Sequence, residues 1–591
     1  MPEIKAHWNC DHAFVVWRYD EPIDECRGFA LERRDPEGKV ELANTWLGFE
    51  DEVADAETMH PSSEWPIQRF MWADLEVRSG ETWSYRAVPM LGPGRPLKRA
   101  TDQATDWSEP IQISASDRHG MSAYFNRGIV ASQWLAKRLD DDPSLTPNQA
   151  LTAIVNDPKN RTRKFLGGEL RQALLRVLHS VRDDGKTVYA CLFELNDPEL
   201  IDALKELGPR ARVVLANGTH ENGEDENAEA REELKHAHVD VHDRMIHSGL
   251  SHNKFAVVCD ANGENPERVW TGSTNWAKTG LCTQANNGIL IESDEVAQDF
   301  RAQWELLKPP ATKFSKELRA SNSAPRTTHT VDEEPGTNGT PPKHVDVTTW
   351  FAPVTGHVDL AAAKRLIDGA KEGILFLMFF PGKENTVLNF INDRGIEGKD
   401  TYDPNLYIHG VINQSTGGTV KLVRRGEHDP PSNVEILLPA AIDDKLGHWH
   451  KELLKLSPGG VMVHSKVVVI DPWTNPIVMT GSHNMGHAAS EGNDDNLVIV
   501  GGSSALASAY AVNIMGIHTQ YRWRNLQSKS EARSTGSRRR FARTADDGKA
   551  GFSGLQDDDK WQDEHFGGAR RRELQFWLGE PVAAPAPART R

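Results

Sequence analysis

Over the first 115 residues, hydrophobic and polar side chains alternate in short segments separated by turn-forming residues. Such alternation predicts half-buried β-strands, because successive side chains of a strand point to opposite faces of its sheet. The predicted strands are Ala13–Tyr19, Gly28–Arg33, Thr82–Met90 and Glu109–Ser114. Tryptophans crowd the same region and can fill a small core, so we expect residues 1–115 to form a small N-terminal β-sandwich.

Two later regions, residues 116–317 and 346–525, combine helical periodicity with short apolar runs. Apolar residues three and four apart predict helices, and short apolar runs bounded by polar residues predict buried strands. The expected helices are Asn126–Leu139, Glu169–Arg182, Ala297–Leu307 and Leu360–Lys371, and the expected strands are Thr187–Glu194, Arg212–Asn217, Gly373–Phe380 and Leu406–Asn413. This alternation predicts an α/β fold with two lobes, each a sheet covered by helices.

Two segments follow neither pattern. Residues 318–345 are dominated by Ser, Thr, Asn, Gly and Pro, which predicts an exposed linker between the lobes. Residues 526–591 are rich in Arg, Ser, Gly and Asp, a composition typical of a mostly disordered C-terminal tail. The one ordered element that we expect in this tail is a short helix near Arg571–Leu578.

The two α/β regions repeat the same polar motifs. The first contains His252-Asn253-Lys254 and Gly272-Ser273-Thr274-Asn275, and the second contains His464-Ser465-Lys466 and Gly481-Ser482-His483-Asn484. Residues 271–291 align without a gap on residues 480–500, which pairs Asn287 with Asn496. A repeat of this length indicates two similar lobes in one chain.

The repeated motifs carry groups suited to phosphate esters. A histidine and a lysine two positions apart on an extended segment point to the same face. Two such pairs, brought together, supply two imidazoles for nucleophilic and acid–base roles and two ammonium groups for the non-bridging oxygens of a phosphodiester. Because one histidine must be neutral while the other is charged, we expect a bell-shaped dependence of rate on pH.

The motifs His-x-Lys-x4-Asp and Gly-Ser-x-Asn, present twice between roughly residues 120 and 525, resemble those of the phospholipase D superfamily. The resemblance implies two pseudo-symmetric αβαβα lobes and a two-step reaction through phosphohistidine, without metal or other cofactor. It implies His252 as nucleophile and His464 as general acid, and near symmetry leaves the reverse order open. Lys254 and Lys466 would bind the phosphate. Further donors and supporting residues would be Asn275, Asn484, Asp260, Asp471, Ser273, Ser482, Asn287 and Asn496.

The first copy departs from this pattern at one position. Five residues separate Lys254 from Asp260, whereas four separate Lys466 from Asp471. One added residue turns a strand side chain to the other face unless a bulge absorbs it. We favour a structural role for both aspartates. Near the second copy, the sequence leaves open whether Glu491, Asp494 and Asp495 orient a histidine or are loop charges.

The N-terminal region offers a weaker resemblance. Trp83–Pro89 and Asp106–Pro110 resemble the last two strands of a fibronectin type III-like module. An unrelated β-rich cap remains the alternative, and the partner of this region is unknown.

Composition narrows the functional class. The chain has 591 residues and a formal net charge of −17, which provides no general attraction to nucleic acid or to an anionic membrane. The five cysteines are scattered, and the histidines at 236, 238, 242 and 247 fit no metal-ligand spacing, so we expect reduced thiols and no metal site. We find neither a signal-like start nor an apolar run long enough to cross a bilayer. We therefore expect a soluble cytoplasmic protein, with export by a route that reads no N-terminal signal left open.

Three functions compete. The first is a phosphodiesterase that hydrolyses or transfers a phosphatidyl group, as bacterial enzymes of lipid metabolism do. The second is a nuclease, which the acidic net charge disfavours but a narrow basic channel would permit. The third is a scaffold without activity, which the two intact His-x-Lys motifs disfavour. Because both half-sites lie in one chain, we expect a monomer.

Overall fold

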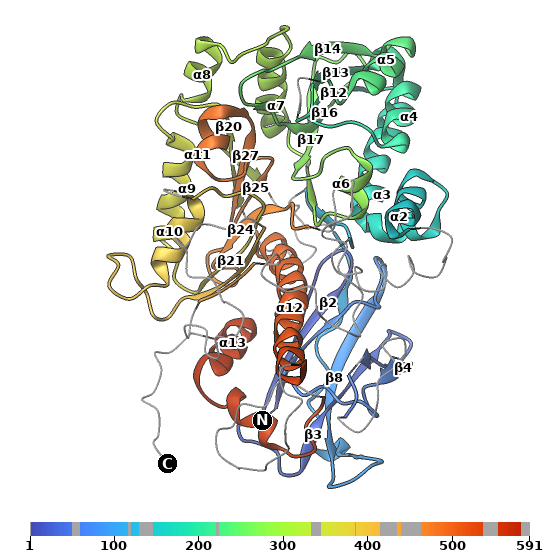
Figure 1. Ribbon diagram of the computed structural model, residues 1–591, viewed down its shortest axis with the longest axis vertical. Helices are drawn as coiled ribbons and strands as arrows, with labels where there is room; N and C mark the ends of the chain where they lie inside the picture. Colours follow the sequence, from blue (N-terminus) through green and yellow to red (C-terminus); the bar gives the residue numbers. More distant parts are fainter. Residues whose placement is uncertain are drawn as a thin grey trace.

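The computed structural model describes residues 2–45, 47–49, 59–115, 120–128, 146–219, 224–332, 344–383, 386–413, 434–438, 462–535 and 554–580. Most of the predicted helix Asn126–Leu139 lies outside the described residues. The N-terminal strands occupy one end of the long axis and the first α/β region occupies the other (Figure 1).

The N-terminal region contains two antiparallel sheets. One has the order β1 (Glu3–Trp8), β2 (Ala13–Arg18), β7 (Met71–Asp74). The other has the order β10 (Ile111–Gln112), β8 (Thr82–Leu91), β3 (Cys26–Arg34), β4 (Val40–Leu42), with β9 (Lys98–Arg99) paired to β8, and β5 (Asn44–Thr45) pairs separately with β6 (His60–Pro61). Buried aromatic side chains, including Trp17, Phe29 and Tyr85, lie between them, and the Trp17 and Phe29 rings are 5.4 Å apart. The resemblance to fibronectin type III stays a prediction.

The first α/β region is built on a seven-stranded sheet. Its order is β11 (Met121–Phe125), β18 (Asn287–Ile291), β17 (Pro266–Gly272), β16 (Lys254–Cys259), β12 (Thr187–Leu192), β13 (Ala211–Ala216), β14 (Asp240–Arg244). Only β12, β13 and β14 run parallel to one another. Its helices are α2 (Pro147–Asn156), α3 (Arg161–Asp183), α4 (Pro198–Leu207), α5 (Ala228–His236), α6 (Lys278–Cys282) and α7 (Asp294–Leu307). Strands β12 and β16 are buried throughout, which explains their continuous apolar sequences.

The second α/β region repeats this strand order. Its sheet runs β19 (Thr328–Asp332), β20 (His344–Phe351), β27 (Asn496–Gly501), β25 (Ile477–Gly481), β24 (Lys466–Ile470), β21 (Gly373–Met378), β22 (Tyr407–Ile412), β23 (Val434–Leu437). Its helices are α9 (Val358–Asp368), α10 (Val387–Arg394), α11 (His487–Gly492) and α12 (Ser504–Thr535). From β20 onward, each strand occupies the place of its counterpart in the first sheet. Strands β21, β22 and β23 are again the parallel ones.

The segment expected to be a linker is partly structured. Residues 316–322 form helix α8 (Lys316–Asn322), and strand β19 adds an antiparallel edge to β20. Residues 318–331 are largely exposed or half-buried, as expected of a linker, but α8 and β19 give them regular structure that was not expected. The segment's polar composition hides a short β-branched stretch, Thr328–Asp332, whose Val331 packs against the core.

The C-terminal segment also differs from the expectation. Residues 554–580 include a 3₁₀ helix (Lys560–His565) and helix α13 (Gly568–Leu578), and they pack against the N-terminal strands (Figure 1). Trp561 and Trp577 are buried there, and the Trp561 indole donates a hydrogen bond of 2.9 Å to the Cys26 carbonyl. The expected disorder is therefore wrong for this segment, although the predicted short helix is present. The prediction failed because it used the average composition of residues 526–591. That average is polar, although Trp561 and Trp577 bury large apolar side chains.

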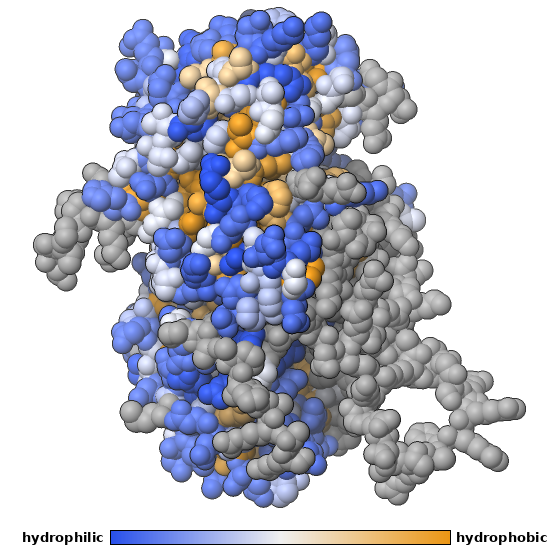
Figure 2. Space-filling view, turned by 90° about the vertical axis from the view of Figure 1, so that its left-hand side faces the viewer, coloured by the Kyte–Doolittle hydropathy of each residue, from blue (hydrophilic) through white to orange (hydrophobic). Residues whose placement is uncertain are grey.

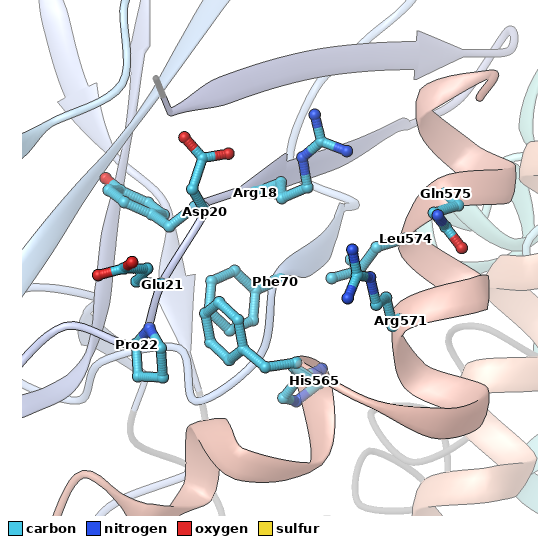
Figure 3. Close-up of a pocket in the computed structure, with 11 residues that line it drawn as sticks. Arg18, Asp20, Glu21, Pro22, Phe70, His565, Arg571, Leu574 and Gln575 are labelled. Atoms are coloured by element: carbon cyan, nitrogen blue, oxygen red, sulfur yellow. The ribbon is translucent and has the colours of Figure 1, made fainter. Parts of the chain in front are cut away.

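A cavity of about 350 Å³ remains where the C-terminal segment meets the N-terminal strands. Figure 3 shows Arg18 and Asp20 on one side of it and Arg571 and Leu574, from α13, on the other. Phe70 and His565 line its floor. The C-terminal segment thus packs against the N-terminal strands but leaves this cavity unfilled.

The outer surface is largely polar. Figure 2 shows a face on which hydrophilic residues predominate and apolar ones form small patches. Within the part of the chain that the structure describes, no helix combines the length and the apolar content that a membrane span requires. One of the large apolar side chains that stay exposed is Phe380.

Candidate active site

The repeated motifs lie at matching ends of matching strands. Lys254 begins β16 and Lys466 begins β24, so each histidine lies two residues before the first residue of its strand. Strands β17 and β25 end at Gly272 and Gly481, whose φ angles are +138° and +145°. A Cβ at either glycine would collide with the backbone oxygen of Asn287 or Asn496. Both the positive φ and this close approach require glycine at the start of each Gly-Ser-x-Asn motif.

Crossed backbone hydrogen bonds hold the two motifs against each other. The His252 amide donates to the Asp494 carbonyl (2.8 Å), and the His464 amide donates to the Ala285 carbonyl (3.0 Å). In the gapless alignment Ala285 corresponds to Asp494, so these two bonds are equivalent. Strand β15 (Leu250–Ser251) also pairs in parallel with β26 (Asn493–Asp494). The two α/β regions therefore meet at their histidine motifs.

Side-chain hydrogen bonds between threonines and the supporting asparagines also join the two regions. Thr480 donates to the Asn287 side-chain oxygen (3.0 Å), and Thr271 donates to the Asn496 side-chain oxygen (2.8 Å). Each bond joins one region to the other. Asn287 and Asn496, predicted as supporting residues, thus lie in the contact between the regions.

Each histidine is oriented by a side chain from the opposite region. Nδ1 of His252 lies 2.7 Å from Oδ1 of Asp495, and Nδ1 of His464 lies 2.8 Å from Oδ1 of Asn286. Because both acceptors engage Nδ1, each ring has Nε2 left for chemistry, with Nδ1 carrying the proton.

The motif serines fix these two acceptors. Ser482 donates to Asp495 and Ser273 donates to Asn286, each over 2.7 Å. Asp495 and Asn286 are aligned in the repeat, yet one is a carboxylate and the other an amide. The sequence left the role of Asp495 open and did not single out Asn286. The gapless alignment of the two copies places Asn286 opposite Asp495, and this correspondence is the sequence signal that could have identified both residues.

The two lysines are buried beside the histidines. Each donates from Nζ to the carbonyl of the histidine two residues earlier, over 2.7 Å for both Lys254 and Lys466. Their Nζ atoms lie 4.7 Å and 4.9 Å from the ring centres of Phe193 and Phe379. Burial lowers the pKa of Lys254 to about 7 and that of Lys466 well below its ordinary value. Bound phosphate would favour the charged ammonium forms.

Burial and positive charge also govern the histidines. Burial, assisted by the Lys254 charge, lowers the pKa of His252 to about 4, even though Asp495 opposes the shift. Burial, with the charges of Lys466 and Lys254, lowers the pKa of His464 well below its ordinary value. Interactions of each histidine with the lysines of both motifs place the four groups in one site.

A carboxylate that the sequence analysis did not single out also reaches the site. Glu194 follows β12 and accepts a hydrogen bond of 2.8 Å from the Asn275 amide. Burial raises the pKa of Glu194, whereas the charge of Lys254 opposes this shift. The corresponding position after β21 is Phe380, which is 47% exposed. The two regions therefore differ at this position, which is a carboxylate bonded to Asn275 in one and an exposed aromatic ring in the other.

The two motif aspartates differ in position. Asp471 is buried and accepts hydrogen bonds from the backbone amides of residues 371–373, at the start of β21. Asp260 is more exposed and accepts from the Glu264 amide (2.9 Å). The register shift between β16 and β17 leaves Glu267 of β17 unpaired, whereas β16 pairs with β12 in unbroken register, so β16 itself does not absorb the added residue in a bulge. Asn484 is half-buried, and its side-chain oxygen has no hydrogen-bond partner within the described residues.

Comparisons with known proteins agree with this geometry. Residues 174–307 match the family described as "Cardiolipin synthase, PLD-like domain", and this segment contains the first copy of the motifs. The mitochondrial cardiolipin hydrolase of Canis lupus familiaris is 26% identical over 162 residues, which are 26% of this chain and 59% of that relative. The chain thus spans about three-fifths of that relative's length.

Two solved structures show weaker likenesses. Phosphatidylserine synthase of Haemophilus influenzae Rd KW20 is 11% identical, with 62% of this chain and 92% of that chain covered at a TM-score of 0.38. The phospholipase D family member Nuc of Salmonella typhimurium is 18% identical, with 23% and 84% covered at a TM-score of 0.19. The family match is the stronger finding: residues 174–307 of this chain are similar to a phospholipase D-like domain.

Proposed function

We propose that the protein is a phosphodiesterase that hydrolyses or transfers a phosphatidyl group through a phosphohistidine intermediate. The two sheets would then be the halves of a pseudo-symmetric enzyme. The observation that carries this proposal is the crossed arrangement in which His252 and His464 each take their Nδ1 partner from the opposite region. It directs two imidazoles and two lysines to one site, as in-line displacement at phosphorus requires.

The different partners of the histidines support a division of roles. A histidine that attacks phosphorus becomes positively charged, and a facing carboxylate stabilises that charge more than an amide does. Asp495 faces His252, and the neutral Asn286 faces His464. We therefore assign His252 as nucleophile and His464 as general acid and base.

The proposed reaction has two balanced steps. In the first, Nε2 of His252 forms a bond to phosphorus, the bond to the leaving oxygen breaks, and His464 gives that oxygen a proton. In the second, water or an alcohol attacks phosphorus, His464 accepts its proton, and the bond between phosphorus and Nε2 breaks. Lys254 and Lys466 would hold the non-bridging oxygens throughout.

Three observations favour a phospholipid over a nucleic acid. Glu194 would repel the neighbouring phosphates of a polyanion, and Phe380 offers an apolar contact at the corresponding position. The net charge of −17 provides no long-range attraction to nucleic acid. The matched family and the curated relative both carry cardiolipin in their names.

The test offers purified protein, in EDTA, two kinds of substrate. Phosphatidylcholine, phosphatidylethanolamine and cardiolipin are supplied in mixed micelles, and single- and double-stranded DNA are supplied separately. We expect headgroup release from a lipid, loss of release in His252→Ala, and retained release in His242→Ala, a matched histidine outside the site. Transfer is measured by adding a primary alcohol.

Trapping separates the proposed mechanism from other routes. Lipid labelled with ³²P at the phosphorus is quenched in alkali, in which phosphohistidine persists, and label on the wild-type protein but not on His252→Ala is expected. Cleavage of DNA alone would replace the lipid assignment with a nuclease. Silence toward every substrate would overturn the proposed activity and favour a scaffold.

A further inference from the structure

We propose that His409, Glu435 and His518 form a structural site for a divalent metal ion with the ligand preferences of Zn²⁺. This site would lie at the far edge of the second sheet and play no part in phosphodiester chemistry. The sequence offered no signal for it, because the three residues are far apart in the chain and follow no ligand spacing.

Two neighbouring strands and one helix bring the three side chains together. His409 on β22 and Glu435 on β23 are direct register partners in the parallel pair. His518 belongs to α12, which packs against both strands. One ligand atom from each residue lies within 4.8 Å of the other two. Two imidazoles and one carboxylate are a donor set known from catalytic zinc sites, in which water takes the fourth position, and here the same set would hold an ion away from the phosphodiester site.

The histidines have donor atoms that the protein leaves unused. His518 is fully buried, and no described atom meets hydrogen-bond geometry at either of its ring nitrogens. Nδ1 of His409, which is also buried, is equally without a described partner. Buried polar atoms are nearly always paired, because an unpaired one loses its hydrogen bonds to water without replacement. A metal ion shared by both rings would satisfy these nitrogens.

Nearby charges leave room for a cation. Arg522 lies with Nε 3.2 Å from Oε1 of Glu435, and its Nη1 lies 3.6 Å from Glu573. A second buried arginine, Arg69, and a third carboxylate, Glu564, belong to the same group of charges, so three carboxylates face two arginines, and Glu435 has a second oxygen available to a metal. A bond length of about 2.0–2.2 Å would draw the three ligand atoms closer than they stand here.

The position suggests what the ion would stabilise. Helix α12 runs between the second sheet and the N-terminal strands (Figure 1). Nε2 of His12, which lies just before β2, is 3.2 Å from the Val512 carbonyl oxygen of this helix. A metal that clamps α12 to β22 and β23 would also fix the helix against the N-terminal region. The expected consequence is greater thermal stability with metal bound.

The experiment uses the full chain without an affinity tag, because a polyhistidine tag would itself bind metal. The protein is stripped with a chelator, dialysed, and titrated with Zn²⁺ while bound metal is measured by elemental analysis. We expect about one tightly bound equivalent per chain and a rise in Tm of about 2 °C or more with saturating Zn²⁺. Cobalt substitution should give the visible absorption of a low-symmetry nitrogen and oxygen site.

Variants locate the ion. His518→Gln and the double variant H409Q/H518Q should lose the bound equivalent and the Zn²⁺-dependent rise in Tm. His565→Gln, a matched buried histidine that does not belong to the three, should keep both. Failure of the stripped wild type to bind a stoichiometric equivalent would overturn the proposal without reliance on any variant. Binding that persists in the double variant would do the same.

Discussion

At the scale of single residues, the informative feature is an asymmetry within a repeat. Ser273 and Ser482 hold equivalent acceptors, and those acceptors hold equivalent histidine nitrogens. The two acceptors differ in charge, because the Asn286 side chain is a neutral amide and the Asp495 side chain is a carboxylate. This difference gives two nearly symmetric imidazoles unequal affinities for a proton.

Giving both histidines a carboxylate partner should therefore shift the dependence of kcat on pH. Asn286→Asp places a carboxylate beside His464 and raises the pKa of that ring, so the protonated general acid persists to higher pH. We expect the alkaline limb of kcat against pH to shift upward by about one unit. Asp495→Asn should instead lower kcat by about 10²- to 10⁴-fold, because it removes the charge that stabilises the cationic nucleophile. An unchanged alkaline limb in Asn286→Asp would contradict the role given to His464.

At the scale of elements, the two α/β regions share an apolar core and are also joined by short pairings at the ends of strands. Strand β15 pairs with β26, and the ends of β17 and β25 exchange threonine–asparagine hydrogen bonds. Beside them, Arg244 at the end of β14 forms a buried ion pair with Asp494. Asp494 lies directly before Asp495, so this ion pair supports the backbone that orients His252.

Removal of the arginine should loosen this contact. Arg244→Met leaves Asp494 buried without its partner, and we expect a loss of about 3–5 kcal/mol in the free energy of unfolding, measured by urea denaturation. Arg182→Met is the matched control, because its ion pairs are exposed to solvent and contribute little to stability. R244M/D494N should recover part of the loss. Equal effects of the two single variants would refute the importance assigned to the buried pair.

At the scale of the whole molecule, the two ends of the chain are packed together. Nε2 of His7 lies 2.8 Å from the Trp577 carbonyl on α13, and Nε2 of His12 lies 3.2 Å from the Val512 carbonyl on α12. Burial lowers the pKa of His7 to about 3 and that of His12 to about 4. Both rings are therefore neutral in the folded protein at pH values where an unfolded chain would already bind protons.

This linkage predicts loss of stability in acid. The folded pKa values lie below the unfolded value of about 6.5, so the contribution is fully present above pH 6.5 and is lost as pH falls toward 4. Each histidine should contribute about 1.4 kcal/mol per pH unit across that window. H7Q/H12Q should show a shallower decline of Tm between pH 6.5 and 4.5 than the wild type, whereas the exposed His179→Gln should not. A wild-type Tm that is constant over this window would rule out the effect.

Much of the local structure follows from local sequence. The apolar run at Gly373–Phe380 predicts β21 (Gly373–Met378), and the periodicity of Glu169–Arg182 predicts most of α3. Both predictions succeed because the spacing of apolar side chains within an element reflects which of its faces are buried. The repeated motifs likewise identified His252, Lys254, His464 and Lys466 as neighbours in space. Composition failed to predict the regular structure in residues 318–332 and 554–580, where a few residues such as Val331 and Trp577 outweigh a polar average.

By itself, then, the sequence determined many of the elements and the internal repeat, and it predicted a class of chemistry. Only the tertiary structure decided that Asp495 faces His252, that Glu194 reaches Asn275, and that His409 lies beside His518. The physical reason is that these pairs join residues far apart in the chain. Periodicity and composition report how each segment meets its surroundings, whereas the identity of a distant partner depends on the path of the whole backbone.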